Sequence, residues 1–300
     1  MATNERERKL HDLGRLVERI CGGDGDRTTV IPGVSLHRYA QPMGRTYCLY
    51  EPAVVIAVQG VKRAILGNES YLFDPTQCLI TSVEVPVMSE LVRATPDAPF
   101  LGIILRLDPQ RIAELIAGMG TVDLQAPPRA RGLATTPLSA DLVDAMLRLV
   151  RLLETPHDIP IIAPLIEREI LYRLVTGEHG THLRHVAAAG SRSHQVVKAV
   201  AWVKERFAHP LRIPDLARAV GMSESTLHHH FKAITSMSPL QYQKQLRLQE
   251  ARRLMLADGL DAASAGERVG YESPTQFSRE YRRLYGAPPL RDVSRLRQSA

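Results

Sequence analysis

Residues 213–232, IPDLARAVGMSESTLHHHFK, return in altered form at residues 262–282, AASAGERVGYESPTQFSREYR. Both copies contain a Val-Gly dipeptide, at 220–221 and at 269–270, and the two dipeptides are 49 positions apart. After one inserted residue, the later matching pairs are all 50 positions apart: Leu227 and Phe277, Phe231 and Tyr281, and Pro239-Leu240 and Pro289-Leu290. A match over this many positions indicates that one structural unit has been duplicated.

Each copy is predicted to be a helix, a turn and a second helix. Apolar or small residues follow the helical spacing i, i+3, i+4, i+7 in both first helices: Ile213, Leu216, Ala217 and Val220, then Ala262, Ala265, Gly266 and Val269. Gly221 and Gly270 allow a positive φ in the turns. Ser223 and Ser273 are placed to cap the second helices, and Pro274 then occupies the favoured first helical position.

The outer faces of the second helices carry polar, neutral-to-basic side chains. If Leu227 and Phe231 point inward, the outer face of the first copy holds Ser225, His228, His229 and Lys232. If Phe277 and Tyr281 do the same in the second copy, its outer face holds Thr275, Ser278, Arg279 and Arg282. Such side chains suit the major groove of DNA, where they meet base edges and phosphates. The alternative is a merely solvated face, which usually carries Glu and Lys pairs. We therefore predict that these helices bind double-stranded DNA.

The helix expected between the copies, from about 239 to 256, sets their separation. About 17 residues at ~1.5 Å each span about 25 Å. That length suits two recognition helices near one DNA turn apart, ~34 Å, so that one chain contacts two successive major grooves. A packing helix from Val196 to Phe207 is expected ahead of the first copy, with Trp202 in the core.

Positive charge is concentrated in the same part of the chain. The 300 residues carry 38 Lys+Arg and 32 Asp+Glu, a formal net charge of +6. Residues 191–300 hold 18 basic and 10 acidic residues, a net +8, whereas residues 1–190 hold 20 and 22, a net −2. Only the C-terminal part is thus suited to a polyanion. The length also predicts two domains, and the 44% hydrophobic content predicts globular ones.

The region from Thr29 to about Leu107 has a sequence pattern typical of short strands. β-branched and aromatic runs alternate with turn residues at roughly 8–12-residue spacing, which predicts a small antiparallel barrel or sandwich. A hairpin turn is expected at 66–70, because Gly67 and Asn68 tolerate positive φ. The predicted fold class is therefore α+β: an N-terminal small antiparallel β-barrel with flanking helices, and a C-terminal all-α domain with two helix-turn-helix motifs.

Amphipathic helices flank the predicted strands. One is expected over residues 1–20, and three apolar stripes follow Pro109: Ile112, Leu115 and Ile116; Leu142, Met146, Leu149 and Leu153; Ile166, Ile170, Leu171 and Leu174. These later helices either cap the barrel or form a dimer interface, and both interpretations stay open. The predicted domains are 1–178, a linker at 179–193, and a DNA-binding domain at 194–298.

No residue cluster predicts a metal, a cofactor or a catalytic site. Cys21, Cys48 and Cys78 lack any CxxC spacing and are expected to be small hydrophobic residues, with redox sensing by Cys48 or Cys78 as the alternative. The linker contains four histidines: His179, His182, His185 and His194. A metal-binding tract is the alternative interpretation of these histidines, but no cluster of Cys or carboxylate residues accompanies them. Without an apolar run of ~18 residues or a secretion signal, a cytoplasmic protein with no membrane contact is expected.

Residues 195–298 resemble the paired helix-turn-helix domain of the AraC/XylS family of bacterial transcription regulators. The second copy carries most of this resemblance, from Val269 through Arg283 and on to Gly286-Ala287-Pro288-Pro289. The stretch from Ile31-Pro32-Gly33 to Arg63 also resembles the cupin-like N-terminal domain of one subset of these regulators.

The resemblance implies a sequence-specific activator or repressor that acts with RNA polymerase. Its N-terminal domain is expected to sense a small molecule and to mediate homodimerisation. By motif position, the implied base contacts are Ser225, His228, His229, Thr275, Gln276 and Arg279, and the phosphate contacts are Lys232, Arg282 and Arg283.

The chain departs from the family pattern in each motif. His229 stands where Arg is common, which leaves the base that it recognises open and implies weakly pH-dependent binding. Ala262, Ala265 and Gly266 are smaller than usual, which implies a less tightly packed second motif.

Two other functions are alternatives to regulation by an effector. A cupin-type enzyme fused to a DNA-binding domain needs a His-x-His pair and further ligands, whereas only His11, His37 and His157 precede the linker. We therefore expect no enzymatic activity. A ligand-independent DNA-binding protein stays open, because sensing leaves no motif in this sequence.

Overall fold

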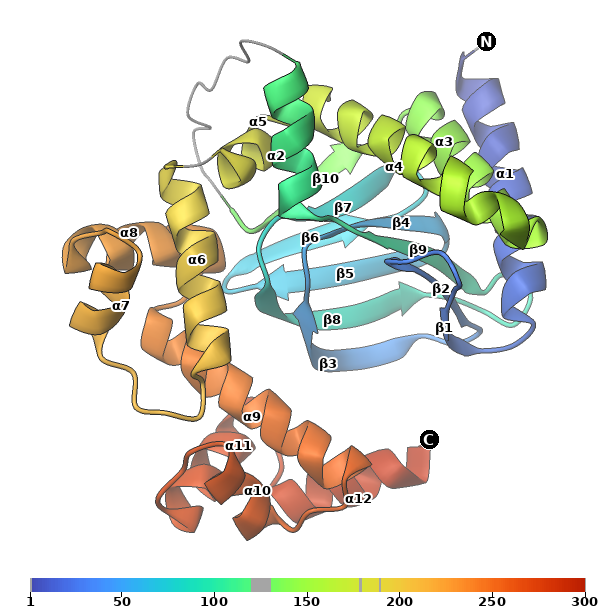
Figure 1. Cartoon of the computed structure of the whole chain (residues 1–300). Coiled ribbons are helices and arrows are strands. Elements are labelled where there is room, and N and C mark those ends of the chain that lie inside the picture. The colour runs from blue at the N-terminus through green and yellow to red at the C-terminus, as the bar shows by residue number, and fades with distance from the viewer. Residues whose placement is uncertain (1, 120–130, 178–179, 189, 300) are drawn as a thin grey trace. The chain divides into compact units, whose positions relative to one another are not determined.

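The computed structural model describes residues 2–119, 131–177, 180–188 and 190–299. The chain divides into two compact units, Met1–His194 and Gln195–Ala300. The first contains two antiparallel sheets and their helices, and the second is helical (Figure 1). This agrees with the predicted α+β fold class.

The first unit is built on a six-stranded and a four-stranded sheet. The larger sheet has the order β1-β2-β9-β4-β7-β10, and the smaller has the order β3-β8-β5-β6. The strands of the larger sheet are β1 (Gly25–Thr28), β2 (Val34–Tyr39), β9 (Phe100–Arg106), β4 (Ala53–Gln59), β7 (Gln77–Thr81) and β10 (Leu133–Pro137). Those of the smaller sheet are β3 (Met43–Tyr50), β8 (Val85–Arg93), β5 (Val61–Leu66) and β6 (Glu69–Phe73).

The predicted hairpin is confirmed between β5 and β6. Leu66 pairs with Glu69, and the loop residue Gly67 has a φ of 61°. Glycine tolerates this left-handed backbone at little cost, so the turn closes where the sequence predicted it. Strand β10 was not predicted, because it lies beyond the region from Thr29 to about Leu107 in which strands were expected.

Helices cover one face of the larger sheet. Alternate residues of β4, Val54, Ile56 and Val58, belong to one buried cluster with apolar residues of these helices. The intervening Ala53, Val55 and Ala57 point to the opposite face, because successive side chains of a strand alternate. The helices are α1 (Ala2–Cys21), α2 (Pro109–Gly118), α3 (Ala140–Arg151), α4 (Ile159–Thr176) and α5 (Gly180–Ala187), with 3-10 turns at Leu152–Glu154 and Pro156–Asp158.

The three apolar stripes predicted after Pro109 pack into this cluster, which confirms that these helices cap the sheet. The segment expected as a linker contains more structure than its composition suggested. Helix α5 lies within residues 179–193 and buries Leu183 and Val186. The predicted domain limits themselves stay a prediction.

The second unit follows the predicted helix order. Helix α6 (Arg192–Glu205) precedes the first copy, which forms α7 (Ile213–Ala219) and α8 (Glu224–Thr235). Helix α9 (Pro239–Ala257) connects it to the second copy, α10 (Ala262–Arg268) and α11 (Pro274–Tyr285), and α12 (Pro289–Ser299) ends the unit. Trp202 is only half-buried, with the guanidinium of Arg206 4.9 Å from its ring centroid. Among the described helices, none has the length and hydropathy needed to cross a membrane.

Candidate nucleic-acid interface

The first motif places α8 through a glycine turn and a serine cap. Gly221 adopts a φ of 67°, and the Ser223 hydroxyl accepts a hydrogen bond from the backbone N–H of Thr226. Leu227 and Phe231 have no exposed surface, and the ring of Phe231 packs edge-on against Tyr242 of α9. The inward face of α8 is therefore fixed by packing, and its opposite face is left to solvent.

The second motif repeats this construction. Gly270 adopts a φ of 89°, and the Ser273 hydroxyl accepts from the backbone N–H of Gln276. Phe277 and Tyr281 are buried, as the sequence predicted. The duplicated sequence thus produces the same turn, the same cap and the same inward positions in both copies.

The second motif is not loosely packed, contrary to the expectation from its small residues. A Cβ built on Gly266 would lie 3.1 Å from two ring atoms of Phe277, so the ring lies directly on α10. The ring of Phe277 also packs against those of Tyr271 and Tyr281, with centroids 5.3 and 5.6 Å apart. Aromatic bulk on α11 fills the space that larger residues on α10 would occupy.

All nine predicted DNA contacts are exposed. Helix α8 presents Ser225, His228, His229 and Lys232, and α11 presents Thr275, Gln276, Arg279, Arg282 and Arg283. Each set lies on one helix, opposite its buried residues, and the structure thereby brings together the side chains within each motif. The Gln276 amide also lies 3.5 Å from a carboxylate oxygen of Glu280.

The three arginines of α11 are exposed. In the described part of the chain, the guanidinium groups of Arg279, Arg282 and Arg283 make no hydrogen bond or ion pair. Glu280 on the same helix instead turns to α9, where its carboxylate lies 2.9 Å from the Nζ of Lys244. Burial acts to raise the pKa of Glu280, but the hydrogen bonds from Lys244 and Tyr271 outweigh it and lower the pKa. The cationic face of α11 is thus kept apart from this negative charge.

Arg247 of α9 joins three segments of the second unit, and sequence patterns did not identify it. Its Nε donates to the carbonyl oxygen of Phe207 at 2.6 Å, and its Nη1 donates to that of Gly270 at 2.9 Å. Its Nη2 donates to the carbonyl oxygen of His209 at 3.0 Å, and the Gln243 amide donates to the same carbonyl oxygen at 2.7 Å. These bonds hold α9, the chain after α6 and the turn of the second motif together.

Asp292 of α12 is a second residue that the sequence did not reveal. It is fully buried, and its carboxylate accepts from Arg252 Nε at 2.9 Å, Tyr281 Oη at 2.9 Å and Arg295 at 2.9 Å. Burial and the adjacent Asp292 charge raise the pKa of Tyr281, so its hydroxyl stays a donor. The carboxylate therefore ties α9, α11 and α12 into one body.

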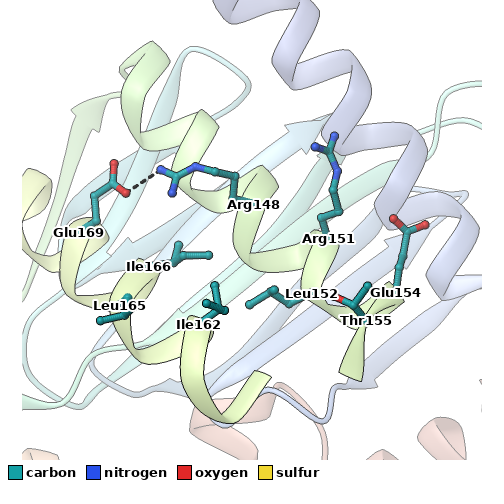
Figure 2. Close-up of a pocket in the computed structure, with 9 residues that line it drawn as sticks. All are labelled: Arg148, Arg151, Leu152, Glu154, Thr155, Ile162, Leu165, Ile166 and Glu169. Atoms are coloured by element: carbon teal, nitrogen blue, oxygen red, sulfur yellow. Dashed lines mark hydrogen bonds and ion pairs between the residues drawn. The ribbon is translucent and has the colours of Figure 1, made fainter. Parts of the chain in front are cut away.

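An apolar groove lies between α3 and α4 of the first unit (Figure 2). Its volume is about 600 Å³, and Leu152, Ile162, Leu165 and Ile166 line it. Arg148 bridges the two helices through a 2.6 Å ion pair with Glu169 at one end. Leu165 is 62% exposed at the edge of this groove, and two further large side chains of α4 are exposed beside it: Ile161 by 69% and Tyr172 by 49%.

The cysteines and histidines form no reactive cluster in the described residues. No group of three His, Cys, Asp or Glu side chains there is arranged to hold a metal ion. His179 and the side chain of His182 lie outside what the structure describes. Burial raises the pKa of Cys78 to about 12 and raises that of Cys48, which disfavours the reactive thiolates that redox sensing needs.

Comparisons with known proteins agree with both units. Residues 30–182 match the family described as the AraC-type transcriptional regulator N-terminus, and residues 216–294 match a helix-turn-helix domain. The regulator ArgR of Pseudomonas aeruginosa PAO1 is 26% identical over 149 residues, which cover 50% of this chain and 45% of ArgR. ExsA of the same strain is 26% identical over 182 residues, which cover 61% of this chain and 63% of ExsA. For ArgR, the match thus spans about half the length of the curated relative.

A solved structure supports the fold. Apo ToxT from Vibrio cholerae strain SCE256 superposes with a TM-score of 0.57, covering 89% of this chain and 98% of ToxT at 10% identity. At that identity the likeness shows the fold alone. The N-terminal family match covers half of the chain, and the paired motifs follow it in the same chain. The chain therefore belongs to the family of AraC-type transcriptional regulators, and its C-terminal unit contains a helix-turn-helix domain.

Proposed function

We propose that α8 and α11 enter two successive major grooves of an operator and that the N-terminal unit controls this binding in response to a small molecule. The observation that carries the proposal is the arrangement of the two motifs. In both, the cap and the inward aromatic or apolar residues fix the second helix, and polar side chains are exposed on its outer face.

The contacts follow from residue chemistry. Ser225, His228 and His229 on α8, and Thr275, Gln276 and Arg279 on α11, are proposed to contact base edges. Phosphate contacts are proposed for the cations farther along the same helices: Lys232, Arg282 and Arg283. Of these, Arg279 has the clearest partner, because a guanidinium binds guanine O6 and N7 with two hydrogen bonds.

Footprinting of the full-length protein on DNA upstream of its neighbouring genes tests this assignment. Two protected segments about one helical turn apart are expected, on the same face of the DNA. Binding should also weaken steeply as salt is raised, because Lys and Arg displace counterions from phosphates. Uniform protection without preferred segments would contradict sequence-specific binding.

We also propose that the protein forms a homodimer through α4. The exposed Ile161, Leu165 and Tyr172 form an apolar surface that a second copy would cover. The groove beside them carries both signs of charge, with Arg151 and Glu154 near one end, so two copies related by a two-fold axis would offer complementary charges.

Analytical ultracentrifugation of Leu165→Glu tests this interface. The substitution places a charge at the centre of the apolar surface and should shift a dimer to a monomer. Lys198→Glu, an exposed change on α6, is the control and should leave the mass unchanged. If wild type sediments as a monomer at micromolar concentrations, α4 is not such an interface.

The remaining parts of the proposal concern partners. The regulator is proposed to act through RNA polymerase on cytoplasmic DNA and to catalyse no reaction. These features are expected of a protein whose matched relatives are transcriptional regulators.

A further inference from the structure

A cleft lies under helix α1, on the face of the larger sheet that the helices cover. Helix α1 packs on β2, β4 and β9 of this sheet. The cleft has a volume of about 590 Å³ and is lined by α1, by the turn between β4 and β5, and by the segment between β8 and β9. It is therefore separate from the space between the two sheets and from the groove between α3 and α4.

The floor of the cleft is apolar. Leu10 of α1, Val58 of β4 and Leu101 of β9 line it, and all three are buried members of the core cluster under the helices. Side chains of this kind offer contact to a hydrocarbon chain but no hydrogen bond. The polar and charged groups of the cleft lie around this floor.

Gly14 opens the cleft, although the fold does not require a glycine there. It lies within α1, and its φ is not positive. A Cβ at this position would lie 3.5 Å from Val58 and 3.8 Å from Leu101, which are ordinary contact distances. Alanine would therefore fit, and it would stabilise the helix. The glycine instead leaves room between α1 and the sheet.

Two arginines line the cleft from different elements. Arg15 belongs to α1, and Arg93 is the last residue of β8. Within the described residues, neither guanidinium makes a hydrogen bond or an ion pair. Two other cations of α1, Lys9 and Arg19, are paired with acids. Positive charge without a partner is thus a property of the cleft and not of the whole helix.

An acid lines the same cleft farther along α1. Glu7 is exposed and has no ion pair among the described residues. Eight residues separate it from Arg15, which corresponds to ~12 Å along the helix axis. His11 lies between them on the same face of the helix. The cleft therefore presents opposite charges at two separate places, with an apolar floor beneath.

Two further acids do not neutralise the arginines. Glu18 also lines the cleft, and its carboxylate lies 3.8 Å from Nη2 of Arg38. Burial raises the pKa of Asp74, and hydrogen bonds from Thr76 together with the charge of Arg93 lower it below its usual value. Asp74 thus feels the charge of Arg93, but its hydrogen bonds come from Thr76.

We propose that this cleft binds a linear zwitterion with an apolar middle, its carboxylate on Arg15 and Arg93 and its ammonium on Glu7. Guanidinium groups suit a carboxylate, because their N–H groups form paired hydrogen bonds with its two oxygens. A ligand with only one charge would leave part of this set without a partner. The inference goes beyond the proposed function, because it assigns a binding site and makes no use of DNA.

Two sources supply this chemistry, ω-amino acids and short peptides. Three peptide residues span about 10 Å when extended, and a chain of eight carbons is of similar length. Both lengths suit the separation of Glu7 and Arg15 along α1. The probes are therefore 8-aminooctanoate and trileucine.

Isothermal titration calorimetry of the full-length protein tests the proposal with four compounds. Octanoate and octylamine share the chain length of 8-aminooctanoate, but each lacks one of its charges. Wild type should bind 8-aminooctanoate about tenfold more tightly than either of them, because each loses a charge-assisted contact. The zwitterion that binds more tightly, 8-aminooctanoate or trileucine, identifies the source.

Variants of α1 locate the site. Arg15→Met and Glu7→Gln should each weaken the bound zwitterion about tenfold, and Gly14→Leu, whose side chain would occupy the cleft, should abolish binding. Arg8→Met is the matched control, since Arg8 is exposed on the same helix and does not line the cleft. It should bind as wild type does. Melting without ligand shows whether each variant is folded.

Three results would overturn the proposal. These are no binding of either zwitterion to wild type, binding of octanoate or octylamine as tight as that of 8-aminooctanoate, and equal affinities of Arg15→Met and Arg8→Met. None of the measurements needs DNA, so a clear footprint with no zwitterion bound would refute the cleft site and leave DNA binding standing.

Discussion

The guanidinium of Arg247 donates a 2.9 Å hydrogen bond to the carbonyl oxygen of Gly270, so the connecting helix holds the turn of the second motif directly. The same guanidinium bonds to Phe207 and His209 in the segment after α6. A residue that belongs to neither α8 nor α11 thus contributes to how the second of these helices is positioned.

Arg247→Met should destabilise the second unit by about 2–4 kcal/mol, because the partly buried carbonyl oxygens of Phe207 and Gly270 would lose a charged donor. Trp202, the single tryptophan, lies in that unit and reports its unfolding in urea by fluorescence. Arg253→Met on the same helix is the control, since Arg253 is exposed and should change the unfolding free energy by well under about 1 kcal/mol. Equal changes in unfolding free energy for the two substitutions would contradict the structural role assigned to Arg247.

Gly270→Ala should damage the fold more than Gly221→Ala, although both glycines occupy the same place in the repeat. Both have a positive φ, which costs an alanine roughly 1 kcal/mol. A Cβ at Gly270 would also lie 1.9 Å from the carbonyl oxygen of Ala208, whereas one at Gly221 would meet nothing closer than 3.8 Å. The midpoints of urea unfolding of the two variants test this prediction. If Gly221→Ala unfolds at a lower urea concentration than Gly270→Ala, the contact between the new Cβ at position 270 and the carbonyl oxygen of Ala208 is relieved at low cost.

Asp292→Asn should cost about 3–5 kcal/mol, because it leaves the buried guanidinium of Arg252 without its counter-charge. Asp258→Asn is the comparison, since Asp258 pairs with Arg253 at the surface and should contribute less than about 1 kcal/mol. Urea unfolding followed through Trp202 measures both. A small effect at position 292 would mean that the three helices are held mainly by apolar packing.

Arg279→Ala should weaken binding to the operator by about 1–3 kcal/mol through loss of a paired hydrogen bond to guanine. Binding to random DNA should weaken far less, because there the substitution removes only the electrostatic attraction between one guanidinium and the DNA phosphates. Fluorescence anisotropy on both DNAs gives the two affinities, with Arg253→Ala as the control for loss of one surface charge. Equal weakening on operator and random DNA would assign Arg279 to phosphate contact instead of base recognition.

The parts of the fold that the sequence predicted well are those set by neighbours along the chain. The caps at Ser223 and Ser273, the turns at Gly221 and Gly270, and the buried faces of α8 and α11 all depend on residues within one or two helical turns. A duplicated segment strengthens such predictions, because each copy tests the other.

The contacts that the sequence did not predict join residues far apart in the chain. Arg247 reaches Phe207 across 40 positions, and Arg252 reaches Asp292 across the same number. Neither arginine differs in local pattern from the exposed Arg253, so periodicity could not separate a buried cation from a solvated one.

The separation of the two sides of α8 and α11 has an evolutionary consequence. The glycine and the inward residues that fold each motif do not belong to the outer side chains proposed to meet DNA. Substitutions on one outer face can therefore alter one half of an operator while the scaffold and the other half stay as they are. A promoter and its regulator can diverge in single small steps, each of which keeps one working half-site.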